Sequence, residues 1–405
     1  MSQWQNIILG DIAFITKLAG YEFTKFFEYI EDGEVIALRG LNLKNGRLDL
    51  SEIKRIRNSV SVNLPRSKLS KGDLLLSYTG TLGQIARIDE NNKFHLGPNV
   101  CLIRPNAEVF GDFLFNYLRS SAFRNSIEAS SVGSTQPTIP MKNIRLIEVP
   151  LPPISEQKAI ASVLSSLDDK IDLLHRQNTI LERMAETLFR QWFVEEAQED
   201  WEFVELGEYV NCFNGVSYKS SELNPSKVAM VTLKSFDRNG GFRLDGFKEF
   251  TGRFKEQHIV AQGDLVVAHT DITQDAEVIG NPVLVVNDTR YEHMVISMDL
   301  VKVKSKYEWL SNEFLYRMMR TREFKEHCLG YSNGSTVLHL SKQAIPSFEF
   351  FMPPKEKIQN YTEVAKNLFA KKFKNIEQIL TLEKLRDNLL PKLMSGDVTI
   401  KNEVN

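Results

Sequence analysis

The sequence predicts an α+β protein in which two pseudo-repeated mixed α/β blocks, residues 1–150 and 201–350, are separated by two long antiparallel helices that form a coiled coil. Three observations predict this arrangement. Short β-branched runs lie between Gly, Asn and Pro turns. A heptad pattern of apolar residues follows residue 150, and seven sequence blocks of the first half recur in the same order in the second half.

The first block, residues 1–150, reads as short strands around one amphipathic helix. The helix is expected from Phe110 to about Ile127, where apolar residues recur at helical spacing. The expected strands are Glu34–Leu38, Asp73–Ser77, Gln84–Ile88, Val100–Ile103 and Ile144–Pro150.

The central segment, residues 151–200, carries the heptad pattern. No Gly or Pro interrupts the chain between Pro153 and Phe193, and Ser155 is the expected N-cap. Two apolar rows keep a spacing of 3.5 residues, which predicts a long helix packed along its length against a partner helix. The residues expected at this seam are Leu164, Ile171, Asn178, Leu181, Leu188, Phe189 and Trp192.

The second block, residues 201–350, repeats the first. Lys71-Gly72-Asp73-Leu74 returns as Gln262-Gly263-Asp264-Leu265, and Gly133-Ser134-Thr135 returns as Gly334-Ser335-Thr336. Two copies are too few for a solenoid, so they indicate a duplication and a pseudo-symmetric molecule. The expected elements are the strands Val228–Leu233, Leu265–Ala268, Val283–Val286, Met298–Val303 and Ile345–Met352, and a helix near Ser311–His327.

A second long helix is expected in residues 351–405, from Lys355 to about Ser395. Its heptad is less regular, because Lys372 and Asn375 interrupt the seam before Leu382 and Leu389 resume it. We expect it to pair antiparallel with the central helix, since each offers a long apolar stripe that needs a partner. Asn178 would set the register of the pair; a polar residue tolerated near solvent is the alternative.

The composition is that of an ordinary globular protein. Apolar runs are too short to span a bilayer, and the N-terminal residues lack a basic stretch followed by an apolar one. The three cysteines are widely spaced, which is typical of a reducing compartment, so we expect a cytoplasmic protein that contacts no membrane. The formal net charge of −2 means that binding to nucleic acid would need local basic patches or a basic partner.

The sequence contains none of the dinucleotide-binding, P-loop, metalloprotease or EF-hand motifs. The seven histidines are scattered, and a metal site needs more ligands than any one region offers. We therefore predict no catalytic residues, no metal site and no cofactor in this chain.

Polar loops are the candidate binding elements. Hydroxyl and amide groups on short loops are suited to base edges and phosphates, and small residues let a backbone approach a phosphate. The candidates are Ser77, Tyr78, Thr79 and Thr81, then Ser134, Thr135 and Gln136, and in the second block His269, Thr270, Ser335 and Thr336. Ordinary polar turns are the alternative interpretation.

Basic residues supply a second set of candidates. Arg39 and Lys234 are expected to end matched strands, and an arginine there could bind a guanine through two hydrogen bonds. Lys54, Arg55 and Arg57 belong to the densest basic run, which suits phosphate contact. A solvated surface is the alternative for this run. At the end of the central helix, the aromatic residues cover the adjoining block or await a partner protein.

These residues resemble the specificity subunit of type I restriction–modification enzymes. The resemblance covers essentially the whole chain and is carried by the segment Leu151–Gln157 running into the long helix, with the Lys71–Leu74 strand, the Gly133-Ser134-Thr135 loop and the C-terminal Leu389–Gly396 segment. In the second copy, Glu356 and Gln359 do not reproduce the Glu156-Gln157 pair.

The resemblance implies two target-recognition domains, each reading one half of a bipartite site in double-stranded DNA, held apart by two helical spacers. It implies that this chain is not an enzyme. The expected partners are two methyltransferase subunits, which bring S-adenosylmethionine, and restriction subunits that use ATP and Mg²⁺. A self-sufficient DNA methyltransferase or nuclease with atypical motifs, and a coiled-coil scaffold that binds no DNA, are the rival interpretations.

Overall fold

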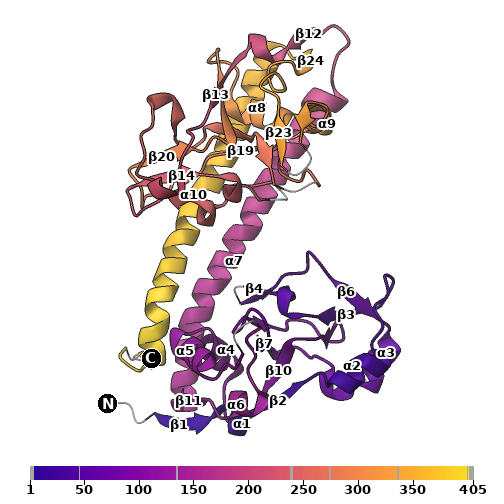
Figure 1. Cartoon of the computed structure of the whole chain (residues 1–405), viewed down its shortest axis with the longest axis vertical. Coiled ribbons are helices and arrows are strands. Elements are labelled where there is room, and N and C mark those ends of the chain that lie inside the picture. The colour runs from indigo at the N-terminus through magenta and orange to yellow at the C-terminus, as the bar shows by residue number, and fades with distance from the viewer. Residues whose placement is uncertain are drawn as a thin grey trace. The chain divides into compact units, whose positions relative to one another are not determined.

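A computed structural model describes residues 4–44, 46–133, 136–237, 240–272, 275–334, 337–398 and residue 400. The chain divides into two compact units (Figure 1). Unit 1 comprises residues 1–173 and 379–405, and unit 2 comprises residues 174–378. Each unit therefore holds one block together with a part of each long helix, and the predicted α+β class is confirmed.

The block of unit 1 is built from short strands and short helices. Its strands are β1 (Gln5–Ile8), β2 (Ala13–Lys17), β3 (Val35–Leu38), β4 (Leu43–Lys44), β5 (Arg47–Leu48), β6 (Lys54–Ile56), β7 (Leu74–Ser77), β8 (Ile85–Arg87), β9 (Phe94–Leu96), β10 (Val100–Pro105) and β11 (Glu148–Leu151). Its helices are α1 (Leu9–Ile12), α2 (Gly20–Phe26), α3 (Asn58–Asn63), α4 (Gly111–Leu118), α5 (Ser121–Ala129) and α6 (Met141–Arg145). The main sheet has the order β2-β10-β7-β8, a second has the order β6-β3-β9, and β1 pairs with β11.

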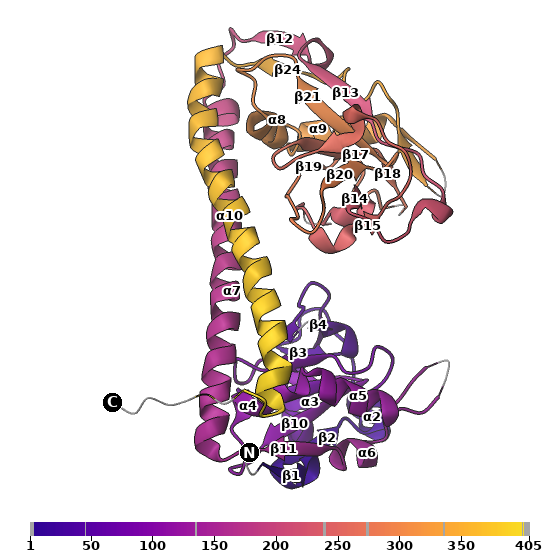
Figure 2. The ribbon, with the colours of Figure 1, turned by 90° about the vertical axis from the view of Figure 1, so that its left-hand side faces the viewer.

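The block of unit 2 has the same plan. Its strands are β12 (Glu202–Glu205), β13 (Val210–Asn214), β14 (Val228–Val231), β15 (Lys248–Glu249), β16 (Ile259–Val260), β17 (Leu265–Ala268), β18 (Thr270–Asp271), β19 (Pro282–Leu284), β20 (His293–Ile296), β21 (Leu300–Ser305), β22 (Ser332–Asn333), β23 (Leu338–Leu340) and β24 (Glu349–Met352), and its helices are α8 (Asn312–Met318) and α9 (Arg322–Gly330). Its sheets β13-β21-β17-β19 and β12-β24 repeat the strand orders of β2-β10-β7-β8 and β1-β11. Its sheet β15-β14-β20-β16 repeats β6-β3-β9 with one further strand, and β18-β23-β22 is a smaller sheet. In Figure 2, α8 and α9 lie beside the β13-β21-β17-β19 sheet.

The repeated Gly-Asp-Leu sequence has a structural cause in both units. Gly72 and Gly263 adopt φ angles of 92° and 83°, which favour glycine. The aspartate that follows accepts a backbone N–H from the turn and pairs with a cation on the neighbouring strand. In unit 1 this is Asp73 with Arg104 at 2.7 Å, and in unit 2 it is Asp264 with Lys302, also at 2.7 Å.

The two long helices are α7 (Ile154–Arg190) and α10 (Lys355–Met394). The N-cap prediction for Ser155 is wrong, because the helix already includes Ile154, and the carbonyl of Pro153 accepts the N–H groups of Glu156 and Gln157. The buried side chain of Gln157 then fastens the helix to its block. It donates to the Pro152 carbonyl and accepts the Phe110 N–H, both at 2.8 Å.

Within each unit, α7 and α10 lie side by side and antiparallel, as predicted (Figures 1 and 2). In unit 1, the Asp168 carboxylate of α7 accepts hydrogen bonds from Arg119 of the block at 2.6 Å and from Arg386 of α10 at 2.9 Å. Burial alone would raise the pKa of Asp168, but the two guanidinium groups outweigh it and the pKa is lowered. This carboxylate therefore joins the block to both helices of its unit.

Unit 2 has a comparable junction around Glu182 of α7. Its carboxylate accepts hydrogen bonds from the Tyr316 hydroxyl at 2.8 Å and from Arg317 at 3.2 Å, and it also pairs with Lys372 of α10. Near it, the buried Asn375 donates to the Asn178 side chain at 2.9 Å. The interpretation of Lys372 and Asn375 as interruptions is wrong, since both bind polar residues of α7 across the seam.

The predicted seam residues differ in burial. Leu164, Ile171 and Phe189 are buried, and so is Leu393 of α10 in unit 1. The remaining predicted seam residues are half-buried, namely Asn178, Leu181, Leu188, Trp192, Leu382 and Leu389.

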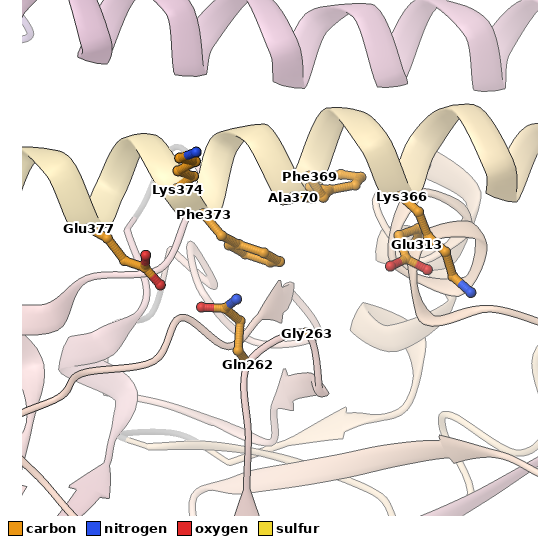
Figure 3. Close-up of a pocket in the computed structure, with 9 residues that line it drawn as sticks. All are labelled: Gln262, Gly263, Glu313, Lys366, Phe369, Ala370, Phe373, Lys374 and Glu377. Carbon is orange, nitrogen blue, oxygen red and sulfur yellow. The ribbon is translucent and has the colours of Figure 1, made fainter.

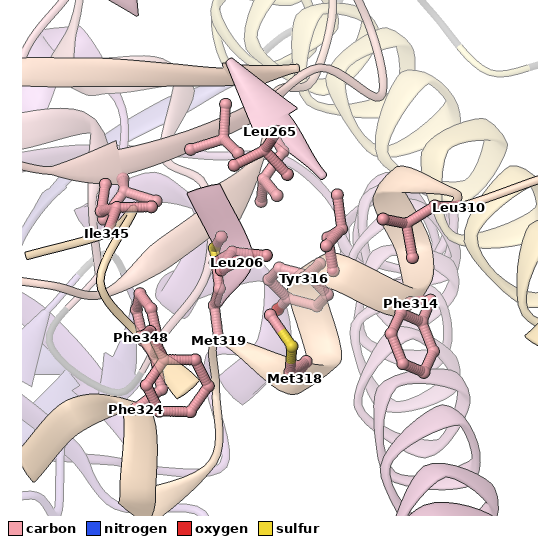
Figure 4. Packing of buried hydrophobic residues seen from close by; sticks show 14 of the residues in the cluster. Leu206, Leu265, Leu310, Phe314, Tyr316, Met318, Met319, Phe324, Ile345 and Phe348 are labelled. Atoms are coloured by element: carbon pink, nitrogen blue, oxygen red, sulfur yellow. The ribbon is translucent and has the colours of Figure 1, made fainter. Parts of the chain in front are cut away.

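The aromatic end of the central helix belongs to the core of unit 2. α7 ends at Arg190, and a π-helical turn, Gln191–Glu195, follows it. Phe193 packs edge-to-face on Phe314 of α8, with ring centroids 5.0 Å apart, and Phe189 lies 5.5 Å from the same ring. Figure 4 shows Phe314 beside α7, next to the cluster around Tyr316 and Met318. These aromatics cover the adjoining block, which was one of the two expectations.

Each predicted block helix is in fact two helices. The prediction of one helix over residues 110–127 is wrong because Ser120 accepts the Phe123 N–H at 3.2 Å and starts α5 anew. In unit 2, Thr321 does the same for α9 by accepting the Phe324 N–H at 3.4 Å. The last predicted strand of each block also starts later, at Glu148 and Glu349.

Candidate nucleic-acid interface

The loop after β7 in unit 1 is a preformed turn. Ser77 is buried; its hydroxyl donates to the Thr81 carbonyl at 2.5 Å and accepts the Gln84 N–H at 2.9 Å. Gly80 and Gly83 have φ angles of 81° and 75°. The Ser77 hydroxyl is thus occupied by the turn, whereas Thr81 is exposed at its tip.

This turn is bonded to the second predicted loop of unit 1. The Gly80 N–H donates to the Pro137 carbonyl at 3.1 Å, and Ile139 donates to the Tyr78 carbonyl at 2.9 Å. Thr79 lies opposite Thr138 in an antiparallel bridge. Gln136 is exposed beside the turn, while Ser134 and Thr135 lie outside the described residues. Two candidate loops that are far apart in sequence therefore form one polar surface.

Tyr78 has a cation close to its ring. The Lys17 ammonium lies 4.9 Å from the ring centroid. Burial raises the pKa of the Tyr78 hydroxyl, and the nearby Cys101 adds to this effect. The phenol therefore stays protonated at neutral pH and keeps its hydrogen-bond donor.

The corresponding loop of unit 2 is held in the same way. β18 pairs with β23, which places Thr270 opposite His339. The Leu340 N–H donates to the His269 carbonyl at 2.8 Å. The Thr270 hydroxyl is buried and donates to the Asp299 carboxylate at 3.0 Å, so it is occupied like that of Ser77. Ser335 and Thr336 lie outside the described residues.

His269 differs chemically from Tyr78, its counterpart in unit 1. Burial lowers its pKa most, His339 and Lys342 lower it further, and Asp299 opposes them. The imidazole is therefore neutral at pH 7, with one donor and one acceptor. The two units present the same backbone arrangement with different side chains.

The basic candidates of unit 1 divide into two kinds. The Arg39 guanidinium donates to the Glu52 carbonyl at 3.0 Å, and that of Arg55 donates to the Gly33 carbonyl at 3.2 Å. Backbone carbonyls thus hold both of these side chains. Lys54 and Arg57 are exposed.

The predicted match between Arg39 and Lys234 is wrong. Arg39 directly follows β3, whereas the residue that directly follows β14 is Thr232. Lys234 lies further on, in a single turn of 3₁₀-helix, Leu233–Ser235. Chance similarity of short apolar runs shifted the alignment by two residues. Lys234 is exposed, and its contact with DNA stays a prediction.

Open hollows lie away from these loops. One hollow in unit 2 measures about 450 Å³ and lies between α10 and the turn at Gln262 and Gly263, with Phe369, Phe373 and Lys366 of α10 in its lining (Figure 3). In unit 1, a hollow of about 330 Å³ includes Asp168 and Arg386 in its lining. Neither contains a predicted site residue.

The described ranges contain neither a cluster of metal ligands nor a membrane-spanning helix. Within the described ranges, no three His, Cys, Asp or Glu side chains gather as a metal site would require. No helix in the same ranges is both long enough and apolar enough to cross a bilayer.

The sequence matches the loop that contains Asp271 and Ile272 to the Ser77–Gly83 loop without singling out either residue, and it gives no role to Lys325 of α9. Asp271 is buried beneath the loop, Ile272 is exposed on it, and Lys325 reaches it from α9. The sequence signal was available for Ile272 alone, because counting from the matched strands β7 and β17 places it where Thr81 stands in unit 1. Asp271 acts through the N–H groups of Val278 and Ile279, and Lys325 acts through carbonyls that lie 46 and 49 residues away in the sequence.

Comparisons with known proteins agree on one family. Residues 1–183 match the family model described as the type I restriction modification DNA specificity domain. The chain is 25% identical over 358 residues to the type I restriction enzyme MjaIX specificity subunit of Methanocaldococcus jannaschii, covering 82% of this chain and 78% of that one. It is 23% identical over 471 residues to the type I restriction enzyme HindI specificity subunit of Haemophilus influenzae, covering 98% of this chain and 100% of that one.

A solved structure shares the fold. The type I restriction–modification S subunit from M. genitalium superposes with a TM-score of 0.59 at 17% identity, covering 97% of this chain and 96% of that one. The likeness extends over both blocks and both long helices.

Proposed function

We propose that each block of this chain reads one half of a bipartite DNA target. The premise is that the chain belongs to the family of type I restriction–modification specificity subunits. The chain is the DNA-recognition component of such a system and not its catalytic part. The half-site of the first block would be read by the surface around Thr81 and Gln136, and that of the second block by the surface around His269.

One observation carries this proposal. The turn that follows the third strand of each main sheet is bonded to a second loop, through Thr79 and Thr138 in unit 1 and through Thr270 and His339 in unit 2. The backbone arrangement is the same, but the exposed chemistry differs. Base edges differ in their donors, acceptors and methyl groups, so unlike side chains on a shared framework suit two different half-sites.

The long helices would set the spacing of the two half-sites. Both α7 and α10 contribute to each unit, and polar contacts across their seam fix one register. An α-helix rises about 1.5 Å per residue, whereas DNA rises about 3.4 Å per base pair. The number of helical residues would therefore translate into a number of base pairs.

Partner subunits would supply the chemistry and part of the DNA affinity. We place two methyltransferase subunits, with S-adenosylmethionine, on this chain, and restriction subunits with ATP and Mg²⁺ in the full complex. The formal net charge of −2 supports this assignment, because a chain without basic excess needs partners to bind phosphates strongly. We place this work in the cytoplasm, where the DNA is.

Two assays test the proposal. The purified chain, incubated with labelled S-adenosylmethionine and plasmid DNA, should transfer no methyl groups until its methyltransferase partner is added. Methylation mapping of cells with and without the chain should show a bipartite motif that depends on it. Turnover by the chain alone would favour a self-sufficient enzyme, and a complex that shifts no duplex DNA at any salt concentration would favour a scaffold.

A further inference from the structure

Ile272 is an apolar side chain displayed at the candidate interface of unit 2. It is 73% exposed, the largest exposed fraction among the large apolar residues that the structure describes. The two residues before it, Thr270 and Asp271, are 5% and 1% exposed. The chain thus passes within one residue from a buried strand to an alkyl group surrounded by water.

Asp271, the residue before Ile272, is anchored to a later segment of the chain. The buried Asp271 carboxylate accepts the N–H groups of Val278 and Ile279 at 2.6 and 3.1 Å. Hydrogen bonds from backbone N–H groups to a charged acceptor are stronger than neutral ones. Asp271 is therefore bonded to the backbone at Val278 and Ile279.

Lys325 of α9 anchors the far side of the same loop. Its ammonium donates to the carbonyls of Ala276 and Ile279 at 2.9 and 2.5 Å, and to the Asn281 side chain at 3.0 Å. All three donors of the ammonium are therefore used. The described residues before and after the tip, Asp271 and 276–281, are therefore held in place, which lowers the ordering cost of a contact made by Ile272.

The first unit has a different residue in this place. Thr79 and Thr270 occupy matching bridges, so Thr81 and Ile272 stand at the same position, two residues further on. Both are exposed. The loop of unit 1 carries the hydroxyl group of Thr81 at this position, and the loop of unit 2 carries the hydrocarbon side chain of Ile272. Both loops are attached to their units by matching bridges. This position therefore varies in the way a base-reading position should.

We propose that Ile272 determines specificity by contacting the C5-methyl group of a thymine in the half-site read by the second block. This inference rests on the proposed function. A branched alkyl group can neither donate nor accept a hydrogen bond, and the thymine methyl is the apolar feature that a major groove presents. Asp271 and Lys325 are positioning residues in this scheme.

The test removes the methyl group of a thymine and shortens the side chain of residue 272. The complete chain, in complex with its methyltransferase partner, is titrated with duplexes that contain the mapped target, and each thymine of the second half-site is replaced in turn by deoxyuridine. We expect one position at which the wild type binds about fourfold more weakly, since burying a methyl group is worth ~0.8 kcal/mol. Ile272→Ala should be insensitive at that position, and Ile272→Val should keep most of the sensitivity.

Deoxyuridine in the first half-site is the internal control, and it should affect wild type and Ile272→Ala equally. The inference is overturned if no deoxyuridine in the second half-site weakens wild-type binding, if Ile272→Ala stays as sensitive as the wild type, or if that half-site contains no A·T pair. In these cases the wild type still binds its bipartite target. Failure of the proposed function is distinguishable, because the wild-type complex would then show no bipartite sequence preference at all.

Discussion

Glu182 joins three elements of unit 2, and its replacement by Gln tests how the block of unit 2 is held against α7 and α10. The side chain keeps one carbonyl oxygen for the Tyr316 hydroxyl but loses its charge. Arg317, whose side chain is 5% exposed, then remains buried with its charge poorly compensated. Removing one partner of a buried ion pair costs about 3–5 kcal/mol. We expect about 3 kcal/mol, since Lys372 still reaches water with 20% of its side chain.

Glu186 provides the matched control. It binds the same Arg317 guanidinium at 3.3 Å, but its side chain is 59% exposed. Exposed ion pairs contribute less than about 1 kcal/mol. Glu186→Gln should therefore have a small effect, although it changes the same charge on the same helix.

Urea unfolding followed by tryptophan fluorescence reports on the correct unit, because Trp192, Trp201 and Trp309 all lie in unit 2. With a slope of about 2–3 kcal/mol per molar urea, Glu182→Gln should lower the midpoint by roughly 1 M. Equal and small shifts for Glu182→Gln and Glu186→Gln would refute the reasoning.

The loss of stability in Glu182→Gln should depend on pH. Burial alone would raise the pKa of Glu182, but Lys372, Tyr316 and Arg317 outweigh it and the pKa is lowered. A carboxyl whose folded pKa is depressed stabilises the protein above its unfolded pKa, and this stabilisation is lost as the pH falls through the folded pKa. The stability difference between wild type and Glu182→Gln should therefore shrink below about pH 4.3. A difference that stays constant from pH 7 to pH 3 would contradict the assignment.

Three further predictions concern the interface and the seam. Ser77→Ala should destabilise unit 1 by about 1 kcal/mol in urea unfolding. Thr81→Ala should leave stability unchanged and alter only the first half-site in methylation mapping. Equal effects of the two variants on stability would contradict the distinction between a hydroxyl used by the turn and an exposed one. Asn178→Leu and Asn375→Leu should each destabilise unit 2 by about 1–2 kcal/mol, and the double variant should recover part of this loss. Additive losses of stability in the double variant would refute coupling between the two residues across the seam. Arg57→Ala should lower the slope of log affinity against log salt by about one; an unchanged slope would remove it from the phosphate contacts.

The repeat and the long helices could be predicted from the sequence because both are patterns that need no tertiary partner. The 3.5-residue period is a local property of α7, and a comparison of the chain with itself detects the duplication. The main sheets β2-β10-β7-β8 and β13-β21-β17-β19 then follow as copies of one topology. The helix breaks at Ser120 and Thr321 could not be predicted, because the helical spacing of apolar residues continues across both N-caps.

The interface could be predicted only in part. The loops at Ser77 and His269 were found from their polar composition, but their pairing with segments 137–139 and 338–340 depends on hydrogen bonds between distant parts of the chain. Composition could not distinguish a hydroxyl occupied by its own turn, as in Ser77, from an exposed one, as in Thr81. Lys372 was interpreted as a defect because its partner, Glu182, belongs to the other helix.

A paired insertion in the two long helices tests the central claim most directly. Seven residues are added to α7 after Arg176 and seven to α10 after Ile376, which keeps the heptad phase and the contact between Asn178 and Asn375. The insertion adds about 10 Å of helix, or about three base pairs of DNA. Methylation mapping should show both half-sites unchanged and a spacer longer by about three base pairs. An unchanged spacer, or an altered half-site, would contradict the account.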